Sequence, residues 1–115
     1  MTNIESLEIV SLMNARREYI LTLTFNMRIF TRVIIDCHYE INHPDITDTL
    51  ILDLVRAQNG KEQEPSSVLN GFSYFRIVDC LKGKFYRLIL TYCEEDFLGV
   101  INAFRVEEVK NDKMA

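Results

Sequence analysis

The sequence has few of the residues that mark common nucleotide-binding and hydrolase sites. Its 115 residues include four glycines, two prolines and no tryptophan. Neither a glycine-rich phosphate loop nor a GxSxG motif is present, so nothing supports a nucleotide-cofactor enzyme or a serine hydrolase. Charged residues interrupt every apolar stretch before it reaches the roughly 18 residues of a membrane-spanning helix. We therefore expect no membrane contact.

Cysteine is also scarce. Cys37, Cys80 and Cys93 are an odd number without CxxC spacing, and each has apolar neighbours, which is typical of reduced, buried thiols in a cytosolic protein. A zinc site would have to combine His38 and His43 with cysteines from distant segments. We expect no disulfide, no metal and no cofactor. The absence of a signal-like charge pattern in residues 1–11 favours a cytoplasmic location.

What is present fits one globular domain. Hydrophobic residues make up 48% of the chain and charged residues 26%, unlike a disordered chain. The length is close to that of one domain and no internal repeat divides it, so we predict a single domain over residues 1–115. The net charge of −4 argues against a general positive field that coats nucleic acid, but leaves room for a local basic patch.

The first half of the chain predicts extended segments followed by two helices. Residues 4–12 and 18–25 favour an amino-terminal hairpin. In 28–42 apolar residues recur at helical spacing, and β-branched residues leave a strand as the alternative. A second helix is predicted at about 46–58, after Pro44 has ended the first. The residues of the first helical stripe are Phe30, Val33, Ile34, Cys37 and Ile41.

The second half predicts three strands. Short connections between 72–80, 84–93 and 97–106 make an antiparallel meander the simplest topology. The polar segment 61–71 is expected to be an exposed connector. In the middle strand one alternating set is strongly apolar, and we expect the helices to cover that face. The predicted fold class is therefore α+β, with two consecutive helices packed on a three-stranded antiparallel meander.

Two histidines are the first candidates for chemistry. His38 and His43 flank the junction between the predicted helices, and histidine is the usual side chain for proton transfer near neutral pH. The alternative is structural: His38 packs beside Ile34, and His43 shapes the turn before Pro44.

A basic hairpin is the second candidate. Arg76 and Arg87 are separated by a short turn and can hold one phosphate between two guanidinium groups, with Lys84 adding positive potential. Tyr74 or Tyr86 can stack a base. The alternative is a solvated hairpin whose charges keep a sheet edge soluble.

Three motifs carry a resemblance to a known family. The segments 37–45 (CHYEINHPD), 74–76 (YFR) and 100–105 (VINAFR), within residues 27–105, resemble the barnase, EndoU, colicin and RelE-like nuclease superfamily of bacterial toxins. The resemblance implies metal-independent cleavage of RNA by attack of the ribose 2′-hydroxyl on the adjacent phosphorus, without a cofactor. It also implies a toxin–antitoxin context with RNA and a cognate inhibitor protein as partners.

On this resemblance His38 or His43 would be the general base or acid, and Arg76 and Arg87 would hold the phosphate. Asn102 stands where the family strand often has a hydroxyl residue, so an inactive relative also fits.

A different class of function remains open. Small α+β domains often act by association, and this chain can be a non-enzymatic interaction module that forms a homodimer through a strand edge or an apolar face. The candidate contacts are Tyr39, Phe72, Tyr74 and Phe97. A small-ligand pocket between helices and sheet is a third possibility.

Overall fold

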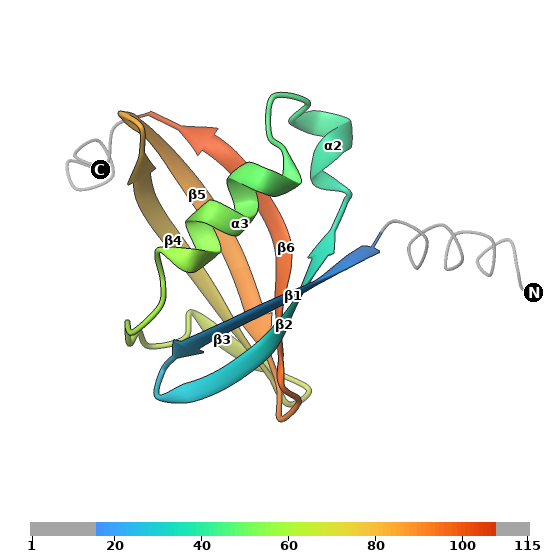
Figure 1. Cartoon of the computed structure of the whole chain (residues 1–115), viewed down its shortest axis with the longest axis vertical. Helices are drawn as coiled ribbons and strands as arrows, with labels where there is room; N and C mark the ends of the chain where they lie inside the picture. The colour runs from blue at the N-terminus through green and yellow to red at the C-terminus, as the bar shows by residue number, and fades with distance from the viewer. Residues whose placement is uncertain (1–15, 108–115) are drawn as a thin grey trace, which may run out of the picture.

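The computed structural model describes residues 16–107, which form a six-stranded mixed sheet with two helices (Figure 1). The predicted extended segment 4–12 lies outside the described residues. The strands are β1 (Arg16–Phe25), β2 (Arg28–Asp36), β3 (Ser67–Leu69), β4 (Phe72–Leu81), β5 (Lys84–Tyr92) and β6 (Phe97–Val106). The helices are α2 (Tyr39–Asn42) and α3 (Asp48–Arg56).

The sheet has the strand order β1-β2-β6-β5-β4-β3. Every neighbouring pair is antiparallel except β2 and β6, which are parallel. The chain therefore makes the hairpin β1–β2, crosses over through α2 and α3 to the far edge, and returns by a four-stranded meander. This return places β6 beside β2 in the middle of the sheet.

The predicted fold of two helices on a three-stranded meander is wrong. Most of the predicted helix 28–42 is strand β2, and only Tyr39–Asn42 is helical. Phe30, Val33 and Ile35 are buried on one side of β2, while Ile34 is half-buried on the other. The β-branched residues fit this two-sided strand well, and pairing with both β1 and β6 outweighs the weak helical spacing.

Two hairpin turns account for the strands that were not predicted. Asn26 and Met27, with φ of 54° and 64°, join β1 to β2 in the left-handed conformation that two-residue hairpin loops require. Asn70 and Gly71 do the same between β3 and β4, inside the segment 61–71 that was expected to be only a connector. Asn-Gly is a strong hairpin signal, whereas Asn-Met is not.

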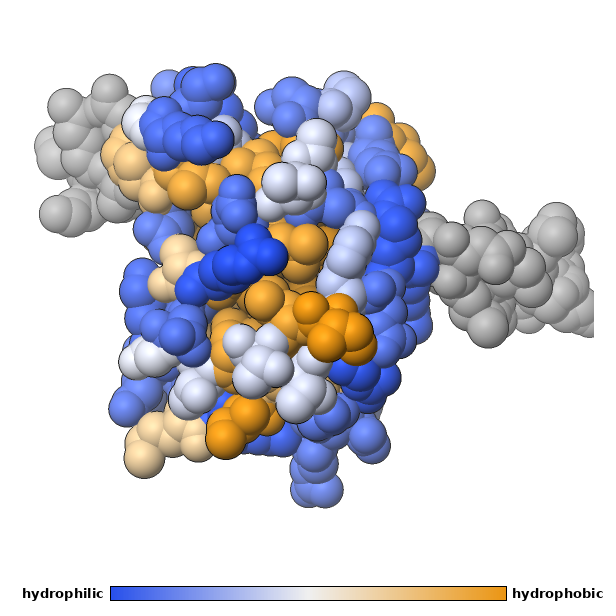
Figure 2. All heavy atoms as spheres, in the orientation of Figure 1, coloured by the Kyte–Doolittle hydropathy of each residue, from blue (hydrophilic) through white to orange (hydrophobic). Residues whose placement is uncertain are grey.

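The core lies between α3 and one face of the sheet. Ile51, Leu54 and Val55 of α3 are buried in one cluster with Leu88 and Leu90 of β5. Thr47 caps α3 by accepting a hydrogen bond from the backbone N–H of Leu50. Figure 2 shows the α3 side of the molecule, where hydrophilic residues border a central hydrophobic strip.

The opposite face of the sheet is called the open face here, because no helix among residues 16–107 packs across it. Strand alternation and register place on it the side chains that lie between the buried ones. Its half-buried apolar members include Ile34, Phe72, Tyr74, Val78, Phe85, Ile89, Phe97, Ile101, Phe104 and Val106.

Candidate functional site

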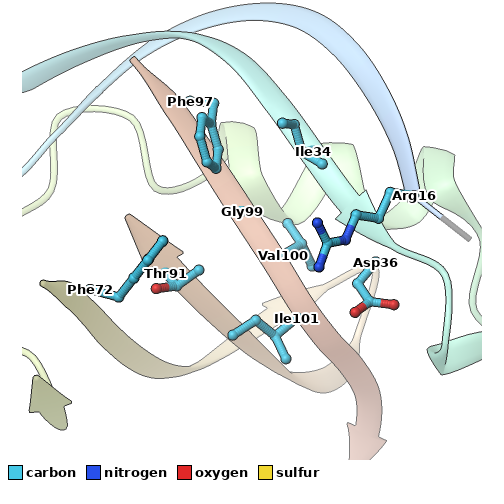
Figure 3. A pocket seen from close by; sticks show the side chains of 9 residues that line it. All are labelled: Arg16, Ile34, Asp36, Phe72, Thr91, Phe97, Gly99, Val100 and Ile101. Atoms are coloured by element: carbon cyan, nitrogen blue, oxygen red, sulfur yellow. The ribbon is translucent and has the colours of Figure 1, made fainter. Parts of the chain in front are cut away.

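A pocket at Gly99 lies at the centre of the open face. It has a volume of about 200 Å³ and is lined by residues of five strands. Figure 3 shows Ile34, Phe97 and Ile101 around Gly99, with Arg16 and Asp36 next to each other at one end. The pocket is therefore mainly apolar, with opposite charges at its rim.

Two irregularities of β6 build this pocket. Gly99 has no side chain to fill the space, and a Cβ atom at that position would lie 3.1 Å from Cγ2 of Thr91. The register between β5 and β6 shifts at Ile89 and Leu90, so that Ile101 is left without a partner in the ladder. A glycine inside a strand and a bulge both often mark places where another molecule approaches the sheet.

A second pocket, the histidine pocket, lies beside the first. His38 and His43 begin and end the short helix α2, next to β6, and both line a pocket of about 340 Å³ together with Asn102. Asp36 and Ile101 line both pockets, so the two are adjacent.

The two histidines are held in different ways. Nδ1 of His38 lies 2.8 Å from Oδ1 of Asp36, which leaves Nε2 for another partner. The ring of His43 stacks on Phe104, with 5.2 Å between ring centroids. Both side chains are accessible, since His38 is exposed and His43 is half-buried. The sequence spacing thus brings together the two histidines, and the fold adds Asp36.

The predicted phosphate-binding residues divide between the two faces. Tyr74, Arg76 and Arg87 lie on the open face, and Arg87 is paired across the strands with Phe104. Arg76 is exposed, whereas Arg87 is half-buried. Arg76 and Arg87 are diagonal neighbours rather than opposite each other, because Arg76 pairs with Ile89.

Other predicted residues lie away from the open face. Tyr86 is 7% exposed and packs in the core on the α3 side, so no base can stack on it. Lys84 alternates with Tyr86 onto that same side and lines a pocket at the end of β5 with Arg105. Tyr39, a predicted interface residue, is 2% exposed. Phe72, Tyr74 and Phe97 do meet on the open face.

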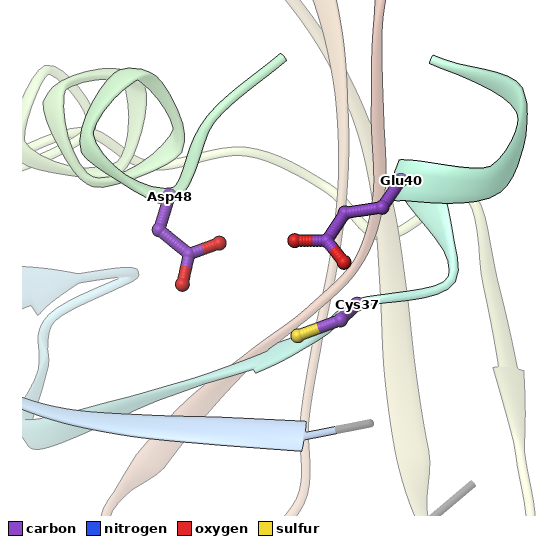
Figure 4. Close-up of side chains that lie close together, drawn as sticks. All are labelled: Cys37, Glu40 and Asp48. Carbon is purple, nitrogen blue, oxygen red and sulfur yellow. The ribbon is translucent and has the colours of Figure 1, made fainter. Parts of the chain in front are cut away.

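A polar cluster on the α3 side has metal-ligand atoms in proximity. The ligand atoms of Cys37, Glu40 and Asp48 lie within 4.8 Å of one another (Figure 4). Arg17 reaches both carboxylates, with 2.6 Å to Asp48 and 2.5 Å to Glu40. Because Arg17 forms ion pairs with both carboxylates, it accounts for their proximity. We therefore interpret the cluster as a structural ion-pair network.

Asp48 is the centre of this network. Burial alone would raise its pKa, but hydrogen bonds from Arg17, Tyr19 and Tyr39 outweigh that effect and lower the pKa to about 2. Burial, followed by the hydrogen bond to Asp48, raises the pKa of Tyr39. Arg17, Tyr19 and Tyr39 come from β1 and α2, so the network fastens α3 to both elements.

Sequence reasoning missed Gly99, Asp36 and Ile34 as site residues. Gly99 carried a signal, because an isolated glycine in a strand pattern suggests close approach of another group. Asp36 and Ile34 carried none, because their segment also fitted a helix, in which they would not lie beside β6.

Comparison with known proteins found no match to a protein-family model, a curated protein or a solved structure. Among residues 16–107, no helix is long and apolar enough to cross a membrane.

Proposed function

We propose that the protein works by association and that the open face is its contact surface. The observation that carries this proposal is the meeting of Phe72, Phe97 and Ile34 around the pocket at Gly99. These residues come from three strands and are far apart in the sequence. Aromatic and aliphatic groups of this kind form the buried centres of protein interfaces.

The chemistry of the pocket favours an apolar ring or branched aliphatic group as its occupant. Its walls are apolar, and its volume of about 200 Å³ suits one large side chain rather than a cofactor. A side chain anchored in a pocket at the centre of an interface is the usual form of a binding hot spot. The pocket at Gly99 is thus the anchor point for the partner.

Indole is a suitable probe for this pocket, because it represents an aromatic side chain without requiring a known partner. In a titration of the protein with indole, we expect the amide signal of Gly99 to shift in nuclear magnetic resonance spectra. The chain has only four glycines, which makes this signal easy to follow. We expect Gly99→Val to abolish the shift of neighbouring Ile101, because the added side chain fills the pocket.

A matched pair of variants distinguishes binding in the pocket from nonspecific binding to exposed apolar residues. Phe97→Ala removes a wall of the pocket, whereas Val68→Ala shortens a residue that is 63% exposed on β3 and faces the other side of the sheet. The first variant should weaken indole binding several-fold and the second should leave it unchanged. Equal effects of both variants, or shifts of equal size on both faces, would refute the proposal.

A second candidate function is metal-independent cleavage of RNA. It is favoured by the geometry of the histidine pocket. His38 and His43 both line this pocket, and Asp36 is hydrogen-bonded to His38. One imidazole would remove the proton of the ribose 2′-hydroxyl as that oxygen attacks phosphorus. The other would give a proton to the departing 5′-oxygen, which leaves a 2′,3′-cyclic phosphate.

Incubation of purified protein with RNA and a chelator tests this candidate. Cleavage should persist in the chelator and fall by at least about a hundredfold in His38→Ala and in His43→Ala. Arg56→Ala, on the exposed side of α3, is the control and should keep the parent rate. Intact RNA with the parent protein, or equal rates in all variants, would exclude the ribonuclease assignment.

A further inference from the structure

We infer that the partner on the open face is a second copy of this chain, related by a two-fold axis that runs along the strands between β6 and β5. This inference rests on the proposed function, because it names the partner of the same surface. Size, strand order and charge support it separately.

The open face is close in size to one side of a standard dimer interface. Five of its strands contain nine or ten residues. At about 4.8 Å between strands and about 3.3 Å per residue, they cover roughly 700 Å². A standard interface buries about 800 Å² on each partner. The face therefore has to be used almost entirely, and two identical faces meet this condition.

The strand order defines which strands would meet. A two-fold axis between β6 and β5 brings β6 of each copy over β5 of the other, and β2 of each copy over β4 of the other. Packed sheets of this kind lie about 10 Å apart, with strand directions within about 30°. The pocket at Gly99, on β6, then faces the half-buried side chains of β5 in the second copy.

The register aligns opposite charges across this axis. Ile35 on β2 and Phe75 on β4 lie level with each other across the sheet. Asp36 follows Ile35 by one residue, and Arg76 follows Phe75 by one residue. They are therefore level with each other, on β2 and β4 respectively. The two-fold operation places Asp36 of each copy opposite Arg76 of the other, and the long arginine side chain can span the offset between twisted sheets. The level positions are Ile35, Val100, Leu90 and Phe75.

Two further arginines of the face, Arg32 and Arg16, do not oppose this arrangement. Arg32 is already paired with Glu18 and with Asp96 of its own chain, at 3.2 Å and 2.9 Å. Arg16 lies next to Asp36 at the rim of the pocket, on the outer strand β1, which would meet the short strand β3. Two contacts between Asp36 and Arg76 therefore form in each dimer.

Charge reversal provides a sharp test. We expect the parent protein to have twice the monomer mass in light scattering at roughly 100 µM, a concentration well above the dissociation constants of many interfaces of this size. Arg76→Glu places two like-charge pairs in the dimer and should weaken it by at least roughly tenfold. Arg56→Glu makes the same charge change on α3 and should leave the dimer intact.

Mixing two variants restores the complementarity. Asp36→Arg alone should also weaken the dimer, whereas an equimolar mixture with Arg76→Glu should form a heterodimer in which both contacts join opposite charges. Because Asp36 also holds His38, Asp36→Asn, which removes the negative charge and keeps the shape of the side chain, is the control for loss of the carboxylate alone.

The outcomes are distinct. A mixture that recovers the parent dimer supports the two-fold arrangement. A parent protein that remains monomeric overturns it, and so does a dimer that Arg76→Glu and Arg56→Glu affect equally. If indole still binds at Gly99 in a monomeric protein, the contact surface stands and only its occupant is different. If neither result is obtained, both proposals fail.

Discussion

Arg17 of β1 and Asp48 of α3, which are 31 residues apart in the chain, are joined by a hydrogen bond of 2.6 Å. This contact ties the edge of the sheet to the first turn of the helix that covers it. The carboxylate of Asp48 lies in the helix turn where the positive end of the helix dipole favours a negative charge. Position and pairing therefore stabilise its ionised form together.

The first prediction concerns acid stability. The pKa of Asp48 lies near 2 in the folded protein, below its ordinary value of 3.8. A lowered pKa contributes stability that is complete above pH 4 and is lost as the pH falls towards 2. The free energy of unfolding can be measured by denaturant titrations at pH 6, 4, 3 and 2. Over this range it should fall by about 1 to 2 kcal/mol less in Asp48→Asn than in the parent. Asp45→Asn, on an exposed residue, should follow the parent.

The second prediction concerns the turn between β1 and β2. Met27 has a φ of 64° and is 79% exposed, so its side chain brings backbone strain and little burial. Met27→Gly should raise the free energy of unfolding by about 1 kcal/mol, because glycine adopts this conformation without a steric penalty. Thr49→Gly, in the exposed part of α3, should lower it by a similar amount. Chemical denaturation checks both, and a destabilised Met27→Gly would contradict this account of the turn.

The third prediction concerns a buried polar contact. Gln58 is 1% exposed, and its Nε2 atom donates to the carbonyl of Leu54 and, over 2.9 Å, to Asp79. Gln58→Ala should cost about 2 kcal/mol, because it leaves a cavity and removes a donor from a carboxylate. Gln63→Ala is the control and should cost less, because Gln63 is only half-buried and its Nε2 donates to one carbonyl and to no carboxylate. Thermal unfolding of the three proteins measures the difference, and equal midpoints for all of them would contradict the prediction.

The fourth prediction concerns thiol reactivity. Cys80 is exposed and Cys37 is buried, and burial raises the pKa of Cys37. Alkylation by iodoacetamide should therefore modify Cys80 first and Cys37 last, because only an accessible thiolate reacts. Mass spectrometry of digests over time gives the order, and denaturant should remove the difference. Early modification of Cys37 in the native protein would mean that its site opens.

Local patterns located the second half of the chain closely. The segments predicted at 72–80, 84–93 and 97–106 correspond to β4, β5 and β6, since strict alternation and short turns leave few other options. The helix predicted at 46–58 corresponds to α3, which has a good cap and a clear stripe. The sequence placed His38 and His43 at one junction, but it gave no sign that Asp36 would be hydrogen-bonded to His38.

The first half could not be assigned in this way. Ile34 belonged to a helical stripe in the sequence and lies on the open face of a strand in the structure. Its neighbours Val33 and Ile35 are buried on the other face. When both faces of a strand carry apolar residues, the period of two is weak and helical spacing arises by chance.

By itself the sequence determined where the chain turns in its second half, which side chains alternate along those strands, and which residue types are available for chemistry. These are properties of neighbouring residues, set by backbone sterics and side-chain spacing. Tertiary structure decided that β6 returns to lie beside β2, and therefore that Asp36, Gly99 and Phe72 share one surface. That choice depends on the free energy of pairing distant strands around α3, which no local pattern contains.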